Sequence, residues 1–303
     1  MVRPGAAWRA LLLAACGALG LGAQTLALTF DDGPNRVRTP RLSPDQRNAA
    51  ILQALKEAKV QAIVFANGID GGDTAEGRAA LAAWGEAGHL VGNHTYSHLR
   101  LADLAAFKTD FLRCDAMIRG IPGYAKLFRF PYLKEGATLD IRDGMRAALA
   151  EAGYRNAPVT IPTFDWLIDE RLRSRLRRDP QADLEPYRTY YLEDVLDQAD
   201  RARALALKLT GREVAHAVLL HHCLLNALFL GDLIRALRAN GWTLVGPLEA
   251  YADPLYRQAP RTLDTGTSLL KTLAAEQGLI PARTEGLEEA YAHEKDRLLK
   301  AGL

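Results

Sequence analysis

Two short stretches of this sequence combine side chains that bind metal ions. Asp31 and Asp32 are adjacent and precede Gly33-Pro34, whereas His94 and His98 are four residues apart. Adjacent carboxylates repel each other, so one takes up a proton unless a cation or an arginine keeps it ionised. Two imidazoles four residues apart reach one point if their segment forms a helical turn. Two histidines and one carboxylate leave open positions for water, as in catalytic zinc sites and non-haem iron sites.

Each stretch also has a plain structural interpretation. Asp-Gly-Pro is favourable turn chemistry, so residues 31–34 taken alone equally predict a solvated turn. A histidine pair with this spacing occurs by chance in many sequences, and taken alone it is weak evidence. Because the two stretches lie only one strand–helix unit apart, together they favour a metal site over two unrelated turns.

Three further polar residues follow apolar segments later in the chain. Arg129 lies within Phe128-Arg129-Phe130-Pro131-Tyr132 and needs a carboxylate partner if it is buried, for which Asp31 is a candidate. The alternative is a surface arginine on an edge strand. His221 and His222 end the apolar run 217–220, and one of them is a candidate general acid with a near-neutral pKa. The remaining histidines are interpreted as satisfied core residues: His89, His216 and His293.

The elements that must position these residues alternate between short apolar strands and amphipathic helices. We predict a helix that starts at Ser43 with Pro44 and Gln46 as capping residues, because this pattern is typical of helix N-termini. Further predicted strands and helices follow in alternation. This alternation predicts an α/β fold with a parallel sheet, open or closed into a barrel, whose catalytic groups gather at the carboxyl ends of the strands. Residues 169–188 are charged and poorly periodic and predict a surface excursion. The predicted strands are 25–30, 62–66, 89–92, 127–131, 154–160, 217–221 and 242–245, and the further helices are 78–87, 102–118, 138–152, 190–209 and 226–239.

The first 23 residues differ in character from the rest. Arg3 and Arg9 precede an uncharged run of small and aliphatic residues that ends at Ala23, a pattern typical of a secretory signal peptide. This run is shorter than the roughly 20 residues that span a bilayer. Residues 13–16 also resemble a bacterial lipoprotein box, which would make Cys16 a lipidated N-terminus with a short tether. We therefore expect export to the periplasm or the cell exterior, and three segments: a signal peptide (1–23), a catalytic domain (24–260) and a C-terminal helical extension (261–303).

Composition excludes several functional classes. The 303 residues are 49% hydrophobic with a formal charge of +2, which is incompatible with intrinsic disorder and argues against a nucleic-acid binder that depends on a basic surface. Removal of residues 1–23 takes away two arginines and no acidic residue, which leaves 36 basic and 36 acidic side chains. We expect no transmembrane segment in this mature chain. A neutral chain must select its substrate through its binding groove, not through general charge attraction.

The motifs, in this order, resemble the polysaccharide deacetylase family, whose catalytic unit is the NodB-homology domain of carbohydrate esterase family 4. The resemblance covers about residues 25–250 and implies a distorted, incomplete (β/α) barrel. It rests on Thr29-Phe30-Asp31-Asp32-Gly33-Pro34, His94-Thr95-Tyr96-Ser97-His98, Arg129-Phe130-Pro131-Tyr132, Asp165-Trp166 and Leu219-Leu220-His221.

The resemblance implies a role for each matching residue in the removal of acetyl groups from an N-acetylated glycan, such as peptidoglycan, a chitin-like oligosaccharide or another envelope polysaccharide. Asp31 would be the general base and His221 the acid that protonates the departing amine. A divalent metal, usually Zn²⁺ and sometimes Co²⁺ or Ni²⁺, would polarise the acetamide carbonyl. The remaining implied roles are metal binding by Asp32, His94 and His98, orientation of Asp31 by Arg129, oxyanion stabilisation by the backbone N–H of Tyr132 after Pro131, and apolar walls from Trp166 and Leu219.

The sequence departs from the family pattern at three positions. Pro162 replaces an aspartate that usually tunes the acid histidine, so either His222 or Asp165 is expected to take over that orienting role. His222 itself replaces the Asp or Ser usual at its position. Leu133 stands where glycine often follows Pro-Tyr, which predicts a narrower groove.

Other functions remain open at this stage. The same chemistry would serve an esterase for O-acetyl groups on xylan, or a hydrolase of another amide or ester. A carbohydrate-binding envelope protein without turnover and a non-haem iron oxygenase are further alternatives. The sequence does not specify the oligomeric state, and export would permit a disulfide between Cys114 and Cys223.

Overall fold

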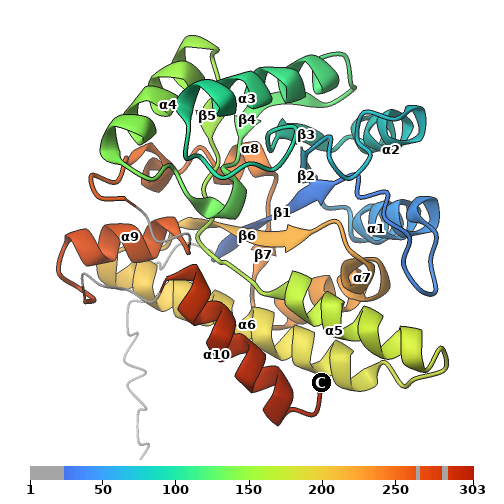
Figure 1. Ribbon diagram of the computed structural model, residues 1–303. Helices are drawn as coiled ribbons and strands as arrows, with labels where there is room; N and C mark the ends of the chain where they lie inside the picture. Colours follow the sequence, from blue (N-terminus) through green and yellow to red (C-terminus); the bar gives the residue numbers. More distant parts are fainter. Residues whose placement is uncertain (1–23, 264–266, 282–285) are drawn as a thin grey trace, which may run out of the picture.

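The computed structural model describes residues 24–263, 267–281 and 286–303. Its centre is a parallel sheet with the strand order β5-β4-β3-β2-β1-β6, and β7 pairs with the start of β1. The sheet curls into a half-barrel surrounded by helices, which is the incomplete (β/α) barrel expected from the sequence (Figure 1). The expected signal peptide and Cys16 lie outside the described residues. The strands are β1 Thr25–Gly33, β2 Ala62–Ala66, β3 Leu90–Asn93, β4 Tyr124–Phe128, β5 Arg155–Asn156, β6 Ala215–His221 and β7 Thr243–Leu244.

Helices connect the strands and cover the sheet. The first helix, α1, begins after Ser43, whose side chain accepts a hydrogen bond from the backbone of Gln46 while the Gln46 side chain bonds back to Ser43. This reciprocal cap is the one predicted from the sequence, and an N-cap of this type contributes about 1 kcal/mol. The helices are α1 Pro44–Ala58, α2 Ala75–Glu86, α3 Leu104–Ile118, α4 Leu139–Glu151, α5 Asp165–Arg178, α6 Glu185–Thr210, α7 Leu224–Ala239, α8 Pro247–Ala250, α9 Leu269–Glu276 and α10 Leu287–Lys300, with short 3-10 turns at Pro131–Leu133 and Pro254–Arg257.

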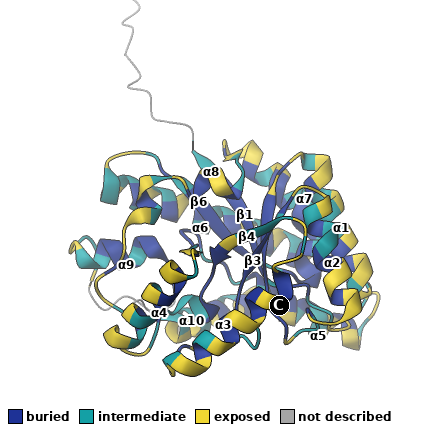
Figure 2. Cartoon of the chain, turned by 90° about the horizontal axis from the view of Figure 1, so that it is seen from above, coloured by how far each residue is buried: buried dark blue, intermediate teal, exposed yellow. Residues whose placement is uncertain are grey.

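The core lies between the sheet and the helices. Figure 2 shows buried strands at the centre and helices whose outer faces are exposed. Every residue of β2 is buried, which is typical of a parallel strand covered on both faces. Ile51 and Leu55 on α1 and Leu233 and Leu237 on α7 have no exposed surface and belong to the same hydrophobic cluster. This packing holds the central strands that carry the polar residues at their carboxyl ends.

The prediction of a surface excursion for residues 169–188 is wrong. Residues 165–178 form α5, and α6 begins at residue 185. Ile168, Leu172 and Leu176 are spaced four apart and are almost completely buried. This single apolar ridge suffices to pack α5 against the core, although arginines occupy most of the neighbouring positions.

The segment after α4 also differs from the predicted strand over residues 154–160. Only Arg155–Asn156 pairs with β4, after which the chain crosses toward the other end of the sheet. There the backbone N–H of Ile161 donates to the carbonyl of Ala217, and Ile161 forms a bridge with Val218 in β6. This crossing brings the start of α5 beside the end of β6.

The C-terminal residues pack into the same core. Leu270 on α9 and Leu298 on α10 have no exposed surface and belong to the main hydrophobic cluster. Cys114 and Cys223 are both buried free thiols, so the structure does not contain the disulfide that export would permit. Among the described residues, no helix combines the length and the apolar composition needed to cross a bilayer.

Candidate active site

Asp31 and Asp32 both face one cavity at the carboxyl end of β1. Successive residues of a regular strand point to opposite faces of the sheet, so two adjacent carboxylates would normally diverge. Here the pairing of β1 with β2 shifts register between Phe30 and Gly33, and Asp32 adopts a left-handed conformation with φ 60°. Such a bulge re-aims a side chain. The irregularity therefore lets one strand end present both carboxylates to the same cavity.

Asp32, His94 and His98 form a cluster with the donor set of a metal site. Oδ1 of Asp32 lies 3.8 Å from Nε2 of His94 and 3.6 Å from Nε2 of His98. Two ligands about 2.1 Å from zinc at a tetrahedral angle are separated by roughly 3.4 Å, so these distances suit a shared ion. Nδ1 of His94 donates to the carbonyl of Arg129 at 2.8 Å, which leaves Nε2 as the free ligand atom. Burial lowers the pKa of His94 to about 3, so its imidazole is neutral.

The two histidines do not lie on a helical turn, which corrects the geometric expectation from their spacing. They belong to an irregular loop after β3, and His98 adopts a left-handed conformation with φ 52°. Two side chains that sequence reasoning missed hold this loop. Oδ1 of Asn93 accepts from the backbone of Thr95 at 2.9 Å, and Oδ2 of Asp110 accepts from the backbone of Ser97 at 2.8 Å.

Arg129 is the predicted partner of Asp31. Its guanidinium has no exposed surface and donates to Oδ1 of Asp31 at 2.8 Å. It also donates to Thr29, to the carbonyl of Ala157 and to the hydroxyl of Tyr251, at 2.7 to 2.9 Å. Burial raises the pKa of Asp31, and the adjacent guanidinium opposes that rise. Tyr251, which no sequence motif indicated, thus completes the set of partners that a buried arginine requires.

His221 is held by Asp165 and not by His222. Nδ1 of His221 lies 2.7 Å from Oδ1 of Asp165, whose other oxygen accepts from the backbone of His221 at 2.7 Å. Burial opposes the charged imidazole, but the carboxylate of Asp165 raises the pKa of His221 to about 9. The ring of His222 instead lies in the core, 2.9 Å from Oδ1 of Asn48, and does not line the cavity. Of the two candidates for the orienting role, Asp165 alone contacts His221.

Two further residues missed by sequence reasoning support Asp165. Asn226, fully buried on α7, donates from Nδ2 to Oδ2 of Asp165 at 2.7 Å and to the carbonyl of His221 at 2.8 Å. The hydroxyl of Tyr191, on α6, donates to Oδ1 of Asn226. Since a flipped amide would turn its oxygen toward a carboxylate, the tyrosine fixes the amide in the orientation that Asp165 needs.

The remaining predicted residues surround the same cavity. Tyr132, Trp166 and Leu219 all line it, whereas Pro131 is buried at the start of the preceding 3-10 turn. Tyr132 and Leu133 adopt left-handed conformations with φ 59° and 54°, which are costly for residues with a Cβ. Leu133 lines the cavity as well, and the narrower groove at this position stays a prediction.

The cavity has a volume of about 660 Å³, in the range of pockets that enclose a small ligand. One of its walls comes from α10, including Tyr291 and His293. His293 is exposed at this wall, so its interpretation as a core histidine is wrong, whereas His89 and His216 are buried as expected.

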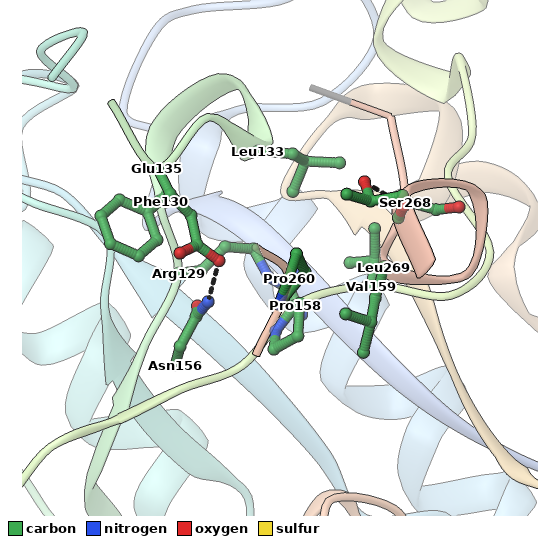
Figure 3. A pocket seen from close by; sticks show the side chains of 11 residues that line it. Arg129, Phe130, Leu133, Glu135, Asn156, Pro158, Val159, Pro260, Ser268 and Leu269 are labelled. Carbon is green, nitrogen blue, oxygen red and sulfur yellow. Dashed lines mark hydrogen bonds between the residues drawn. The ribbon is translucent and has the colours of Figure 1, made fainter. Parts of the chain in front are cut away.

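Figure 3 shows a second cavity, which Leu133 also lines, with Glu135 bonded to Asn156. At about 30 Å³ it has room for one water molecule and not for a substrate.

Comparison with known proteins agrees with this geometry. Residues 20–157 match the family described as polysaccharide deacetylase. This segment belongs to the polysaccharide deacetylase family. The deacetylase segment contains the candidate metal ligands, Asp31 and Arg129, whereas His221 and α10 lie beyond it.

Curated relatives resemble about half of this chain. A peptidoglycan-N-acetylglucosamine deacetylase of Bacillus cereus is 29% identical over 144 residues, which cover 46% of this chain and 46% of the relative. A chitin deacetylase of Colletotrichum lindemuthianum is 32% identical over 149 residues, covering 46% and 52%. The chain thus spans about half the length of the curated relatives that it matches.

A solved polysaccharide deacetylase structure from Bacillus cereus shares the fold, with a TM-score of 0.54 and 20% identity. The similarity covers 74% of this chain and 91% of that one. The incomplete (β/α) barrel is therefore the fold of this family, and it extends well past the segment that sequence comparison matches.

Proposed function

We propose that this protein is a metal-dependent hydrolase that removes acetyl groups from an N-acetylated glycan, with Asp31 as base and His221 as acid. The observation that carries the proposal is the composition of one cavity. Asp32, His94 and His98 form a metal-binding set, and the two acid–base groups flank it with separate partners, Arg129 for Asp31 and Asp165 for His221.

A divalent cation bound by Asp32, His94 and His98 would supply Lewis-acid polarisation of the acetamide carbonyl. Asp31 removes a proton from the attacking water as its oxygen bonds to the carbonyl carbon. The charge that develops on the carbonyl oxygen is stabilised by the backbone N–H of Tyr132. His221 then gives its proton to the amine nitrogen as the C–N bond breaks, which leaves acetate and a free amino sugar.

The charged partners of Asp31 and His221 explain why the first group is deprotonated and the second protonated. Arg129 keeps a positive charge within hydrogen-bond distance of Asp31, which favours the ionised base. Asp165 keeps a negative charge beside His221, which favours the protonated acid. Catalysis by one acid and one base requires environments that keep the base deprotonated and the acid protonated at the same pH.

The substrate class rests on the named relatives. Those relatives act on peptidoglycan and chitin, both polymers of N-acetylated amino sugars, so an N-acetylated envelope or chitin-like glycan is the proposed substrate. Zn²⁺ is the proposed metal, because two imidazoles and one carboxylate form a typical catalytic zinc set, with Co²⁺ and Ni²⁺ as alternatives.

Acetate release from a glycan panel tests the proposal. The mature chain (residues 24–303) would be loaded with Zn²⁺, Co²⁺ or Ni²⁺ and incubated with acetylated chitooligosaccharides, peptidoglycan and acetylxylan. We expect acetate from an N-acetylated glycan, and a loss of about 10²–10⁴-fold in Asp31→Asn with the metal still bound. Asp143→Asn, at an exposed carboxylate outside the cavity, is the matched control.

Each outcome of this panel has a distinct meaning. Acetate from acetylxylan alone would favour the esterase alternative. Glycan binding without acetate from any substrate would favour a non-catalytic binding protein. An active Asp31→Asn variant would overturn the assignment of the base.

We also propose that the protein is exported. The pattern of residues 1–23 supports this, as do relatives whose named substrates, peptidoglycan and chitin, lie in cell walls. N-terminal sequencing of the protein from cell fractions would show a start at Gln24 in the soluble exported fraction. A membrane-bound form that becomes soluble in Cys16→Ser would instead identify a lipoprotein, and an intact Met1 in the cytoplasm would exclude export.

A further inference from the structure

One face of α10 lines the cavity that contains the metal-binding cluster. Four of its residues there are spaced by three or four positions and share one side of the helix: Leu287, Ala290, Glu294 and Arg297. Tyr291, Glu288 and His293 lie beside this row and also line the cavity. This helix lies outside residues 20–157, the segment that matches the deacetylase family. The wall that it forms is therefore supplied by this chain's own C-terminal sequence.

Charged contacts fix α10 against α6 (Figure 1). Glu294 accepts from the hydroxyl of Tyr190 and from Arg297, each at 2.7 Å, and Arg297 also donates to Asp194 at 2.9 Å. Glu294 and Asp194 are each only 2% exposed. Buried carboxylates are costly unless they are paired, so this network stabilises the helix at one position over the cavity.

An aromatic pair joins α10 to the candidate catalytic groups. The ring of Tyr291 stacks on the ring of Trp166, with centroids 5.5 Å apart and planes 8° from parallel. Trp166 directly follows Asp165, the carboxylate that holds His221. Flat aromatic surfaces beside polar side chains suit a saccharide, whose ring has a face of C–H bonds and an edge of hydroxyl groups.

The cavity is much larger than the reacting group. An acetamide has four non-hydrogen atoms and fills on the order of 100 Å³, at about 30 Å³ for a water-sized group. The cavity measures about 660 Å³. Most of its volume, including the part beside α10, is therefore available to the sugar and its neighbours.

We propose that the inner face of α10 forms a saccharide-binding subsite for the sugar next to the acetylated one, and that Tyr291 determines the preference for oligosaccharides over small acetyl compounds. This inference rests on the proposed function, because it assigns the neighbouring sugar of that substrate. Ala290 lies on the same face, where a larger side chain would occupy the subsite without removing a contact of the fold.

Variants on the two faces of α10 test the subsite. Tyr291→Ala removes the aromatic surface, Ala290→Arg fills the space, and Lys295→Ala on the exposed face is the matched control. Acetate release would be compared for N-acetyl-chitotetraose and for 4-nitrophenyl acetate, which reaches only the acetyl site. We expect a 5- to 10-fold lower kcat/KM for the tetraose in Tyr291→Ala, a loss of at least that size in Ala290→Arg, and less than a 2-fold change for the small ester.

Other results would overturn the subsite. These are an equal loss for both substrates or an unchanged tetraose rate in Ala290→Arg. A binding measurement distinguishes a failure of the subsite from a failure of the proposed function. Calorimetry would compare chitotetraose binding to Asp31→Asn with and without Tyr291→Ala. Binding that depends on Tyr291, together with no acetate release by the wild-type protein from any glycan, would support the subsite and reject the activity.

Discussion

The imidazole of His221 donates a 2.7 Å hydrogen bond to Oδ1 of Asp165, and this carboxylate is shielded from water. Asp165 has no exposed surface, and its oxygens also accept from Thr163, Trp166 and Asn226. Burial opposes the charged carboxylate, but the charge and hydrogen bonds of His221, together with the bond from Asn226, lower the pKa of Asp165, which therefore stays ionised beside the imidazolium. The carboxylate of Asp165 thus favours a protonated His221, and the protonation state of this imidazole should control activity at high pH.

Replacement of Asp165 by asparagine should shift the alkaline limb of the pH–rate profile. In the wild-type protein His221 stays protonated until the pH approaches its pKa of about 9, so kcat should fall above that pH. Without the carboxylate, burial lowers the pKa toward its ordinary value of 6.5, and at that value the protonated fraction and hence activity at pH 8 should fall by about 30-fold. The measurement is kcat against pH from 5 to 10. An unmoved alkaline limb would exclude His221 as the acid.

His222→Asn should leave the pH–rate profile unchanged and lower the stability of the fold. The ring of His222 is buried among Asn48 and Trp84, away from the cavity. We expect an unchanged alkaline limb and a loss of about 1–3 kcal/mol in the free energy of unfolding, since a packed, hydrogen-bonded side chain is replaced. Urea unfolding and the same pH profile measure the two effects. A shifted limb with unchanged stability would return the orienting role to His222.

Tyr191→Phe should lower kcat while KM changes little. The substitution removes the hydroxyl that fixes the amide of Asn226, and through it Asp165, but touches no cavity residue. We expect a kcat reduction of about 3- to 10-fold, equivalent to one hydrogen bond of about 0.5–1.5 kcal/mol. Tyr187→Phe is the control, because Tyr187 is a buried tyrosine on the same helix whose hydroxyl bonds to none of the residues that the structure describes. Equal effects in the two variants would indicate a general loss of packing.

Removal of the metal should abolish acetate release reversibly. Chelation of the purified protein should eliminate activity, and added Zn²⁺ or Co²⁺ should restore it. His98→Ala should lose at least tenfold in metal affinity, because one of three ligands is missing. Metal content by mass spectrometry and acetate release measure the two properties together. Full activity in a metal-free sample would refute the metal-dependent mechanism.

Much of the site follows from local sequence because the carboxyl ends of parallel strands converge. Asp32, His94 and His98, and the pairing of Arg129 with Asp31, could be predicted from motifs at the ends of β1, β3 and β4. The conformation of the histidine loop could not, because Asn93 and Asp110 rather than a helical period determine it. Periodicity alone cannot reveal such side-chain-to-backbone bonds.

The site residues that lie on helices could not be predicted from local sequence. Asn226 and Tyr191 lie on different helices, and their meeting depends on how α6 and α7 pack. Tyr291 reaches the cavity from a C-terminal helix whose sequence contains no catalytic motif. The buried ridge of α5 was obscured by its arginines, since a charged composition outweighed three well-spaced apolar residues.

The left-handed backbone at Leu133 indicates how this pocket could be altered. A residue with a Cβ loses about 1–2 kcal/mol in that conformation, whereas glycine adopts it freely at a cost of about 0.5–1 kcal/mol in unfolded-state entropy. Leu133 also lines the cavity, so its side chain takes up space there while its backbone is strained. The substitution Leu133→Gly would therefore remove a side chain from the cavity and relieve the backbone strain together. It would give a broader pocket with little or no loss of thermal stability.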